Sequence, residues 1–212
     1  MDLKGRCKLN PYHHPHYPLL IVVSGPSGVG KDTIARALIE RRPKDFYFVV
    51  TATTRKPRPG EVHGRDYFFL HSDEFARMID EGELLEYELV CNDYKGVPKQ
   101  QIRDALASGK DVVMRVDVQG AATIRRLVSG AIFIFLIADS EEAMVQRLRE
   151  RKSETPEGLS LRIATARREM QRIQEFDYCV VNADGLQEQA VDTILSIMAA
   201  ERARVGHDPV QL

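Results

Sequence analysis

The sequence has almost no net charge, because 30 Lys and Arg residues are balanced by 31 Asp and Glu residues. Proteins that bind nucleic acid or anionic membranes through their overall charge need an excess of basic residues, so we expect neither partner. The chain also lacks an apolar run of the roughly 18 residues that mark a membrane-spanning helix. Any function that needs positive charge must therefore come from local clusters.

Cysteine is scarce, and the three cysteines Cys7, Cys91 and Cys179 are odd in number and far apart. This spacing indicates neither a disulfide framework nor a metal-binding motif. The N-terminal region lacks the apolar segment of a secretory signal and the Arg and Ser content of a transit peptide. We expect a cytoplasmic protein, or one of the plastid or mitochondrial matrix if the source is a plant. Residues 1–17 are expected to form a flexible leader.

Continuous apolar runs alternate with helical patterns along most of the chain. Such runs are typical of strands buried on both faces of a parallel sheet, with helices covering each face. The sequence therefore predicts an α/β fold with such a sheet. Its predicted strands lie at 18–25, 46–54, 111–120, 131–139 and 178–184, and a final amphipathic helix lies at 186–205.

The stretch SGPSGVGKDT, residues 24–33, connects the first predicted strand to the first predicted helix. Its spacing is that of a phosphate-binding loop of the P-loop NTPase type. Glycines let backbone N–H groups approach phosphate oxygens, and the helix N-terminus adds a positive partial charge. We predict that the loop binds ATP, with Lys31 at the β- and γ-phosphates. The predicted ATP-binding residues here are Gly25, Pro26, Ser27, Gly28, Val29, Gly30, Lys31, Asp32 and Thr33.

Two aspartates are candidates for contact with Mg²⁺, directly or through water. Asp32 stands where the usual loop has a Ser or Thr hydroxyl that reaches the metal, and a purely structural role is the alternative. Asp117 ends an apolar run, where a parallel sheet would place a metal-directed carboxylate. A helix N-cap is the alternative for Asp117. We expect Mg²⁺ as the cofactor.

Residues 51–103 break the alternation of strands and helices. Arg55 and Arg58 lie three residues apart in a segment stiffened by prolines, and guanidinium groups favour bidentate contacts to phosphate. Glu86 lies among apolar neighbours, and its carboxylate can accept two hydrogen bonds from the guanine edge. A surface position on an amphipathic strand explains Glu86 equally well.

A second break surrounds the turn at Pro156–Gly158, which lies between Arg151 and Arg162. Arginines on a mobile flap can close over ATP and neutralise charge on the phosphoryl group in transfer. A solvated helical hairpin would have a similar sequence, so both interpretations stay open.

Taken together, these motifs resemble guanylate kinase from Pro18 to about Val205. GPSGVGK, TATTRKPRPGEVHGRDYFF, GELLEY, VDVQGA and FDYCVVN occur in the family's order and spacing. The details GKD, YKGVPKQQI and RVDVQGAAT are most similar to the plant plastid type. The resemblance implies transfer of the γ-phosphoryl group of ATP to GMP or dGMP, with ATP and GMP as small-molecule partners. We expect a monomer or a homodimer.

The resemblance also implies a division of the chain and a role for each site residue. A core ATP-binding domain at 18–50, 104–149 and 164–205 would carry a GMP-binding lobe at 51–103, a lid at 150–163 and a tail at 206–212. Guanine would face Thr51, Glu86 and Asp117, and the GMP phosphate would meet Arg55, Arg58 and Tyr67. ATP would also meet Arg151, Arg162 and Asn182. The implied catalytic residues are Lys31, Arg55, Arg151 and Arg162.

Three residues depart from the pattern of many family members. Lys95 replaces a Tyr that touches the GMP phosphate and can substitute for it through charge. Val97 replaces a hydroxyl that touches guanine, and Arg115 replaces an acidic residue. Two other functions stay open, which are a kinase for another phosphorylated acceptor and a non-catalytic binding module.

Overall fold

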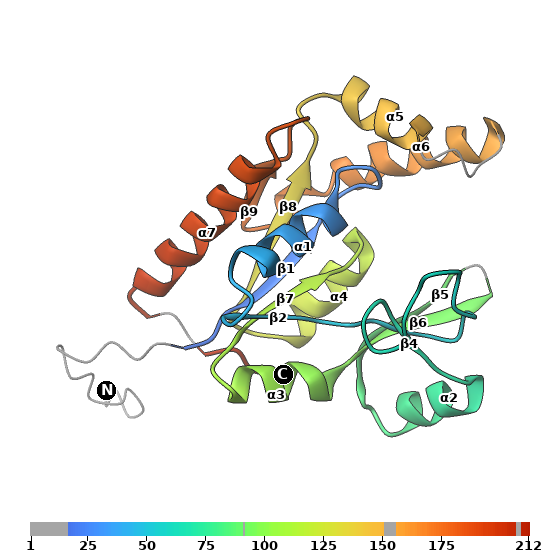
Figure 1. The fold of residues 1–212 in the computed structure, drawn as a ribbon, viewed down its shortest axis with the longest axis vertical. Coiled ribbons are helices and arrows are strands. Elements are labelled where there is room, and N and C mark those ends of the chain that lie inside the picture. The colour runs from blue at the N-terminus through green and yellow to red at the C-terminus, as the bar shows by residue number, and fades with distance from the viewer. Residues whose placement is uncertain (1–16, 91, 151–155, 207–208) are drawn as a thin grey trace, which may run out of the picture.

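The computed structural model describes residues 17–90, 92–150, 156–206 and 209–212, and two sheets organise them (Figure 1). The larger sheet has five strands in the order β2-β7-β1-β8-β9, and all of its neighbouring strands run parallel. The predicted α/β class and the five predicted core strands are confirmed. These strands are β1 (Leu20–Ser24), β2 (Phe46–Phe48), β7 (Asp111–Arg115), β8 (Ala131–Ile137) and β9 (Tyr178–Val181).

Helices cover both faces of the larger sheet because its strands are apolar on both sides. In β1, Ile21 and Val23 pack in one buried cluster, whereas Leu20 and Val22 pack in another. The first cluster includes side chains of α1 (Lys31–Arg41), α5 (Glu141–Glu150), α6 (Pro156–Met170) and α7 (Gln187–Ala203). The second includes side chains of α3 (Lys99–Ala107) and α4 (Val118–Leu127). Within the described ranges, no helix is long and apolar enough to cross a membrane.

A smaller, four-stranded sheet lies beside the larger one (Figure 1) and falls within the predicted lobe at 51–103. It has its own core, in which Phe75 is fully buried with Ala52 and Leu84. Its strands are β3 (Ala52–Thr53), β4 (Phe68–Phe69), β5 (Leu84–Val90) and β6 (Asp93–Pro98), and α2 (Ser72–Asp80) packs on it. A 3₁₀ turn, η1 (Ile173–Glu175), precedes β9. The functional division into core, lobe and lid stays a prediction.

A buried ionic contact joins three elements of the larger domain. Asp111, at the start of β7, is 4% exposed and accepts a hydrogen bond from the backbone N–H of Leu19 at 2.9 Å. Its second oxygen accepts from the guanidinium of Arg202 on α7. Removing one partner of such a contact leaves the other desolvated and unpaired.

We expect Asp111→Ala to lower the free energy of unfolding by about 2–4 kcal/mol, because both Leu19 N–H and Arg202 lose their acceptor. Urea unfolding monitored by circular dichroism measures the loss. Asp192→Ala is the matched control, since Asp192 pairs with Arg41 at the surface, where its side chain is 63% exposed. The control should lose less than about 1 kcal/mol. Equal losses in the two variants would contradict the role given to Asp111.

Candidate active site

The glycine loop between β1 and α1 lies very close to the ends of β8 and β9. Gly25 and Gly30 have positive φ angles of 135° and 86°, which favour glycine. A Cβ atom at Gly25 would lie 2.2 Å from the carbonyl oxygen of Leu136, and one at Gly30 would lie 2.4 Å from Nδ2 of Asn182. Packing and backbone conformation therefore favour glycine at these two positions, most strongly at Gly25, where the contact is with a backbone oxygen.

Lys31 lies at the centre of this loop. Its Nζ donates hydrogen bonds to the carbonyl oxygens of Gly25 at 2.6 Å and Pro26 at 2.8 Å. Burial lowers the pKa of Lys31 to about 8, and Glu169 opposes this effect. A bound phosphate would supply the anionic partner that the backbone carbonyl groups do not.

Two side chains support the loop from other elements. Asn182 is 3% exposed, and its Nδ2 donates to the carbonyl oxygen of Val29 at 2.9 Å. Glu169 on α6 accepts a hydrogen bond from the backbone N–H of Ser27 at 3.3 Å. The predicted contact of Asn182 with ATP stays a prediction. Sequence reasoning missed Glu169, since nothing in the local pattern of α6 indicates that it reaches the loop.

Asp32, in the first turn of α1, forms an ion pair with Arg115 at the end of β7. The Asp32 side chain is 52% exposed, whereas that of Arg115 is only 23% exposed. This contact gives the unusual carboxylate of the loop a structural partner, as the structural alternative for Asp32 requires. Contact of Asp32 with Mg²⁺ stays a prediction.

A cavity of about 190 Å³ brings the loop and the smaller sheet together. Five of the seven residues predicted to bind GMP line it together with Lys31, and Arg55 and Arg58 are not among its lining residues. The predicted residues in its wall are Lys31, Thr51, Tyr67, Glu86, Lys95 and Asp117, and the others are Glu88, Arg115, Val116 and Gly120. Side chains from sequence segments far apart thus share one site.

Acidic groups gather on one side of this cavity. Burial raises the pKa of Glu86 to about 7, and the nearby carboxylates of Glu88 and Asp117 raise it further. Burial also raises the pKa of Glu88, as do the charge of Asp117 and a hydrogen bond with it. Sequence reasoning missed Glu88, although residues two apart on a strand point to the same face. Asp117 is the N-cap of α4, where it accepts from the backbone N–H of Gly120 at 2.7 Å.

Arg55 lies beside the cavity and is held by a neighbouring carboxylate. Its Nη1 and Nη2 each lie 2.9 Å from an oxygen of Glu61, which is a bidentate pair. The Arg55 guanidinium also lies 5.2 Å from the centre of the Tyr67 ring. Glu61 accepts a further hydrogen bond from the backbone N–H of Arg58, whose side chain is exposed. Sequence reasoning missed Glu61.

The remaining predicted residues are distributed around this centre. Arg162 lies on α6 and is partly buried, whereas Arg151 lies outside the described residues. Val97 is 1% exposed and packs in the apolar cluster of α3 and α4. An apolar side chain at this position therefore serves the core, and the cavity receives no hydroxyl from it.

Comparison with known proteins places this architecture among nucleotide kinases. The family model described as guanylate kinase matches residues 17–201. The chain is 55% identical over 203 residues to guanylate kinase 2, chloroplastic/mitochondrial, of Oryza sativa subsp. japonica, covering 95% of this chain and 71% of that protein. It is 41% identical over 197 residues to guanylate kinase of Clostridium perfringens, covering 93% of this chain and 90% of that protein.

A solved structure shows the same fold. The crystal structure of guanylate kinase from Anaplasma phagocytophilum superposes with a TM-score of 0.71 at 28% sequence identity. The similarity covers 91% of this chain and 90% of that chain. The likeness therefore includes both sheets rather than the loop alone.

We expect Glu86→Gln to stabilise the protein more at pH 8 than at pH 5. The folded-state pKa of Glu86, about 7, lies above its ordinary value of 4.5, so the favourable contribution of the protonated form is lost as the pH rises through 7. Gln carries no charge and avoids this loss, and the gain in unfolding free energy should be roughly 1–3 kcal/mol larger at pH 8. Urea unfolding at the two pH values measures it.

The control is Glu83→Gln, because Glu83 is exposed just before β5 and its side chain lies outside the cavity wall. This variant should change stability by the same small amount at both pH values. A Glu86→Gln variant with the same pH response as the control would contradict the raised pKa.

Proposed function

This chain belongs to the guanylate kinase family, and from that premise we propose that it transfers the γ-phosphoryl group of ATP to GMP or dGMP. The observation that carries the proposal is the shared cavity. Lys31 of the glycine loop lies in the same wall as Thr51, Tyr67 and Glu86 of the lobe. A triphosphate on the loop and a monophosphate in the cavity would therefore meet end to end.

Recognition of the acceptor divides between its base and its phosphate. An ionised Glu86 accepts hydrogen bonds from N1–H and the amino group of guanine, and adenine does not offer this pair of donors. Lys95 lines the same cavity and supplies positive charge for the GMP phosphate. Arg55, oriented against the Tyr67 ring and Glu61, is positioned beside it. These contacts support GMP as the acceptor.

The chemistry needs no general base, because the acceptor phosphate is already anionic. Its oxygen forms a bond to the γ-phosphorus while the bond to the bridging β–γ oxygen breaks, which leaves GDP and ADP. Catalysis is then positioning together with neutralisation of charge. Lys31 and the lid arginines Arg151 and Arg162 would stabilise the phosphoryl group, and closure would exclude the water that otherwise hydrolyses ATP.

Two carboxylates near the glycine loop and the cavity suit a Mg²⁺ ion that is bound together with ATP. Among the described residues no group of three or more His, Cys, Asp or Glu side chains is placed to hold a metal ion. Proteins usually bind Mg²⁺ through substrate phosphates, waters and one or two carboxylates. Asp32 is half exposed next to Lys31 and would hold the ion through water, with Asp117 as the second candidate. Bound to ATP, the ion would neutralise phosphate charge.

We also propose that the protein acts in a plastid or in mitochondria. The rice relative is named as chloroplastic/mitochondrial, which supports the plastid or mitochondrial alternative over the cytoplasm. A monomer or a homodimer stays a prediction. The intact glycine loop supports catalysis over a non-catalytic binding module, since such a module has no need of Lys31 and its supporting contacts.

We expect GMP and dGMP to be phosphorylated fastest when GMP, dGMP, AMP and UMP are compared under identical conditions. The reason is that only guanine presents two adjacent donors to Glu86. A coupled assay of ADP formation measures the four steady-state rates. A faster rate with AMP or UMP would overturn the assignment and would favour a kinase for another acceptor, in agreement with the buried Val97.

We expect Arg55→Ala to lower kcat/KM for GMP by roughly 100-fold, because a bidentate contact to the acceptor phosphate is lost. Arg65→Ala is the matched control, since Arg65 is an exposed arginine of the same segment that pairs with Asp66. The kcat/KM of the control for GMP should stay within about threefold of the wild-type value. Both variants should keep the wild-type circular dichroism spectrum. Equal activity of the two variants would remove Arg55 from the site.

A further inference from the structure

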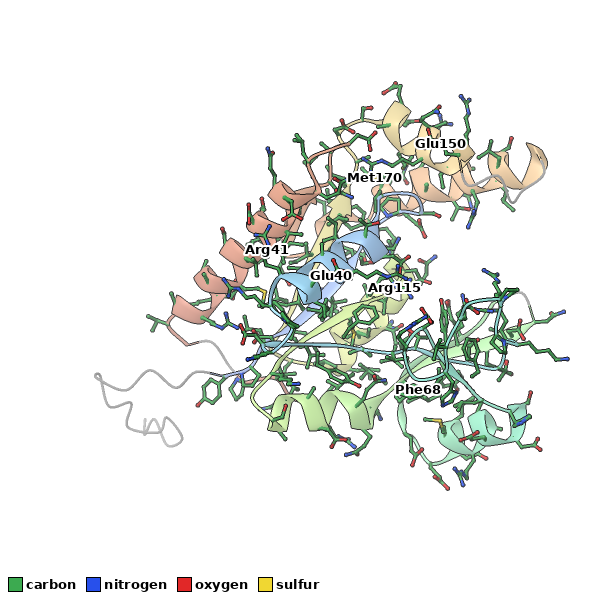
Figure 2. The ribbon with its side chains drawn as sticks, in the orientation of Figure 1. Glu40, Arg41, Phe68, Arg115, Glu150 and Met170 are labelled. Carbon is green, nitrogen blue, oxygen red and sulfur yellow. The ribbon has the colours of Figure 1, made fainter. Side chains whose placement is uncertain are left out.

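Arg115 lies where the larger sheet meets the cavity. It is the last residue of β7 and pairs in register with Val23 of β1, immediately before the glycine loop. Its side chain lies at the edge of the larger sheet that faces the smaller sheet (Figure 2) and lines the cavity with Lys31. The guanidinium therefore lies at the junction of the loop and the cavity.

Two cations are held close together at this junction. Burial is the main cause of the lowered pKa of Lys31, and the charge of Arg115 lowers it further, whereas the charges of Glu169, Asp117 and Asp32 act against both. Like charges at one site are unfavourable unless an anion lies between them. Asp32 supplies one negative charge to Arg115 from the side of α1, and Lys31 and Arg115 both line the cavity, whose carboxylates Glu86, Glu88 and Asp117 belong to the same wall.

The guanidinium of Arg115 also keeps donors available. Of its five N–H groups, only those on Nη1 have a partner among the described residues, which is Oδ1 of Asp32. Pairing with Asp32 alone would add little to the stability of the fold, because half-exposed ion pairs contribute little. The remaining donors suit oxygens of a phosphoryl group, which a guanidinium binds in a fixed fork geometry.

We propose that Arg115 is a further catalytic residue, which contacts the phosphoryl group as it passes from the loop to the acceptor in the cavity. Asp32 is its positioning residue and holds the guanidinium at the junction before the substrates bind. This inference rests on the proposed function. It adds a cation from the larger sheet to Lys31 and to the arginines of the predicted lid.

The first test compares kcat for GMP phosphorylation in Arg115→Gln, Arg115→Lys and the wild type. Gln removes the charge at similar length, so kcat should fall by at least tenfold, whereas Lys should recover at least a third of the lost activity on a logarithmic scale. Arg41→Gln is the control, because Arg41 pairs with carboxylates at the other end of α1. The kcat of Arg41→Gln should stay within threefold of the wild-type value.

A second variant separates contact with phosphate from structural pairing. Asp32→Ser breaks the pair with Arg115 and restores the usual hydroxyl of the loop, while Arg115 remains. If Arg115 contacts the phosphoryl group, Asp32→Ser should lose less activity than Arg115→Gln. If the pair is only structural, either variant breaks the same contact, so kcat should fall equally in both. That result would overturn the proposal.

Binding gives a readout that does not depend on turnover. Calorimetry would compare GMP alone with a bisubstrate analogue in which a chain of five phosphates joins adenosine to guanosine. Arg115→Gln should weaken binding of the analogue at least tenfold and change binding of GMP less than threefold. Equal weakening of both ligands would place Arg115 in GMP binding instead and overturn the proposal.

Failure of this inference is distinguishable from failure of the proposed function. A wild-type chain without GMP kinase activity would remove the proposed function and the inference together. An active wild type with an Arg115→Gln variant that loses less than tenfold in kcat would remove the inference alone.

Discussion

The close approach of the glycine loop to the ends of β8 and β9 is the constraint on which the site depends. No side chain fits at Gly25, because the Leu136 carbonyl oxygen occupies the place of its Cβ atom. The loop can therefore pass from β1 to α1 in one arrangement, which fixes where Lys31 begins the helix. Asp32 follows Lys31 and so meets Arg115 from the neighbouring strand. Loss of this packing would displace Lys31 and the carboxylate of Asp32 that pairs with Arg115.

Local patterns in the sequence predicted the larger sheet but little of the smaller one. Strands of the larger sheet are buried on both faces and read as apolar runs, so a short window is enough to find them. In the smaller sheet, β3 and β4 have two residues each, and they exist only because they pair with partners distant in sequence. Such elements have no periodicity of their own.

The site shows the same division between local and distant signals. The glycine loop and the paired arginines of the lobe have local patterns with a chemical reason, and five predicted acceptor residues meet in one cavity. Of the carboxylates that were missed, Glu61 lies six positions from Arg55 and Glu88 two positions from Glu86, so a local spacing was available, whereas Glu169 reaches the loop only through folding. Asp32 and Arg115 are 83 positions apart, and Ser27 and Glu169 are 142 apart, so no local spacing could connect them.

The bidentate pair between Arg55 and Glu61 has a consequence for the resting protein. Glu61 presents two oxygens to the guanidinium in a bidentate geometry that a phosphate can also adopt, so under the proposed function Glu61 would be a tethered competitor of the acceptor phosphate. A spherical anion such as chloride has no pair of oxygens to accept both N–H groups, so it competes poorly with the bidentate carboxylate. In the proposed site, the acceptor phosphate would have to displace Glu61, so the same pairing that orients Arg55 would also weaken phosphate binding.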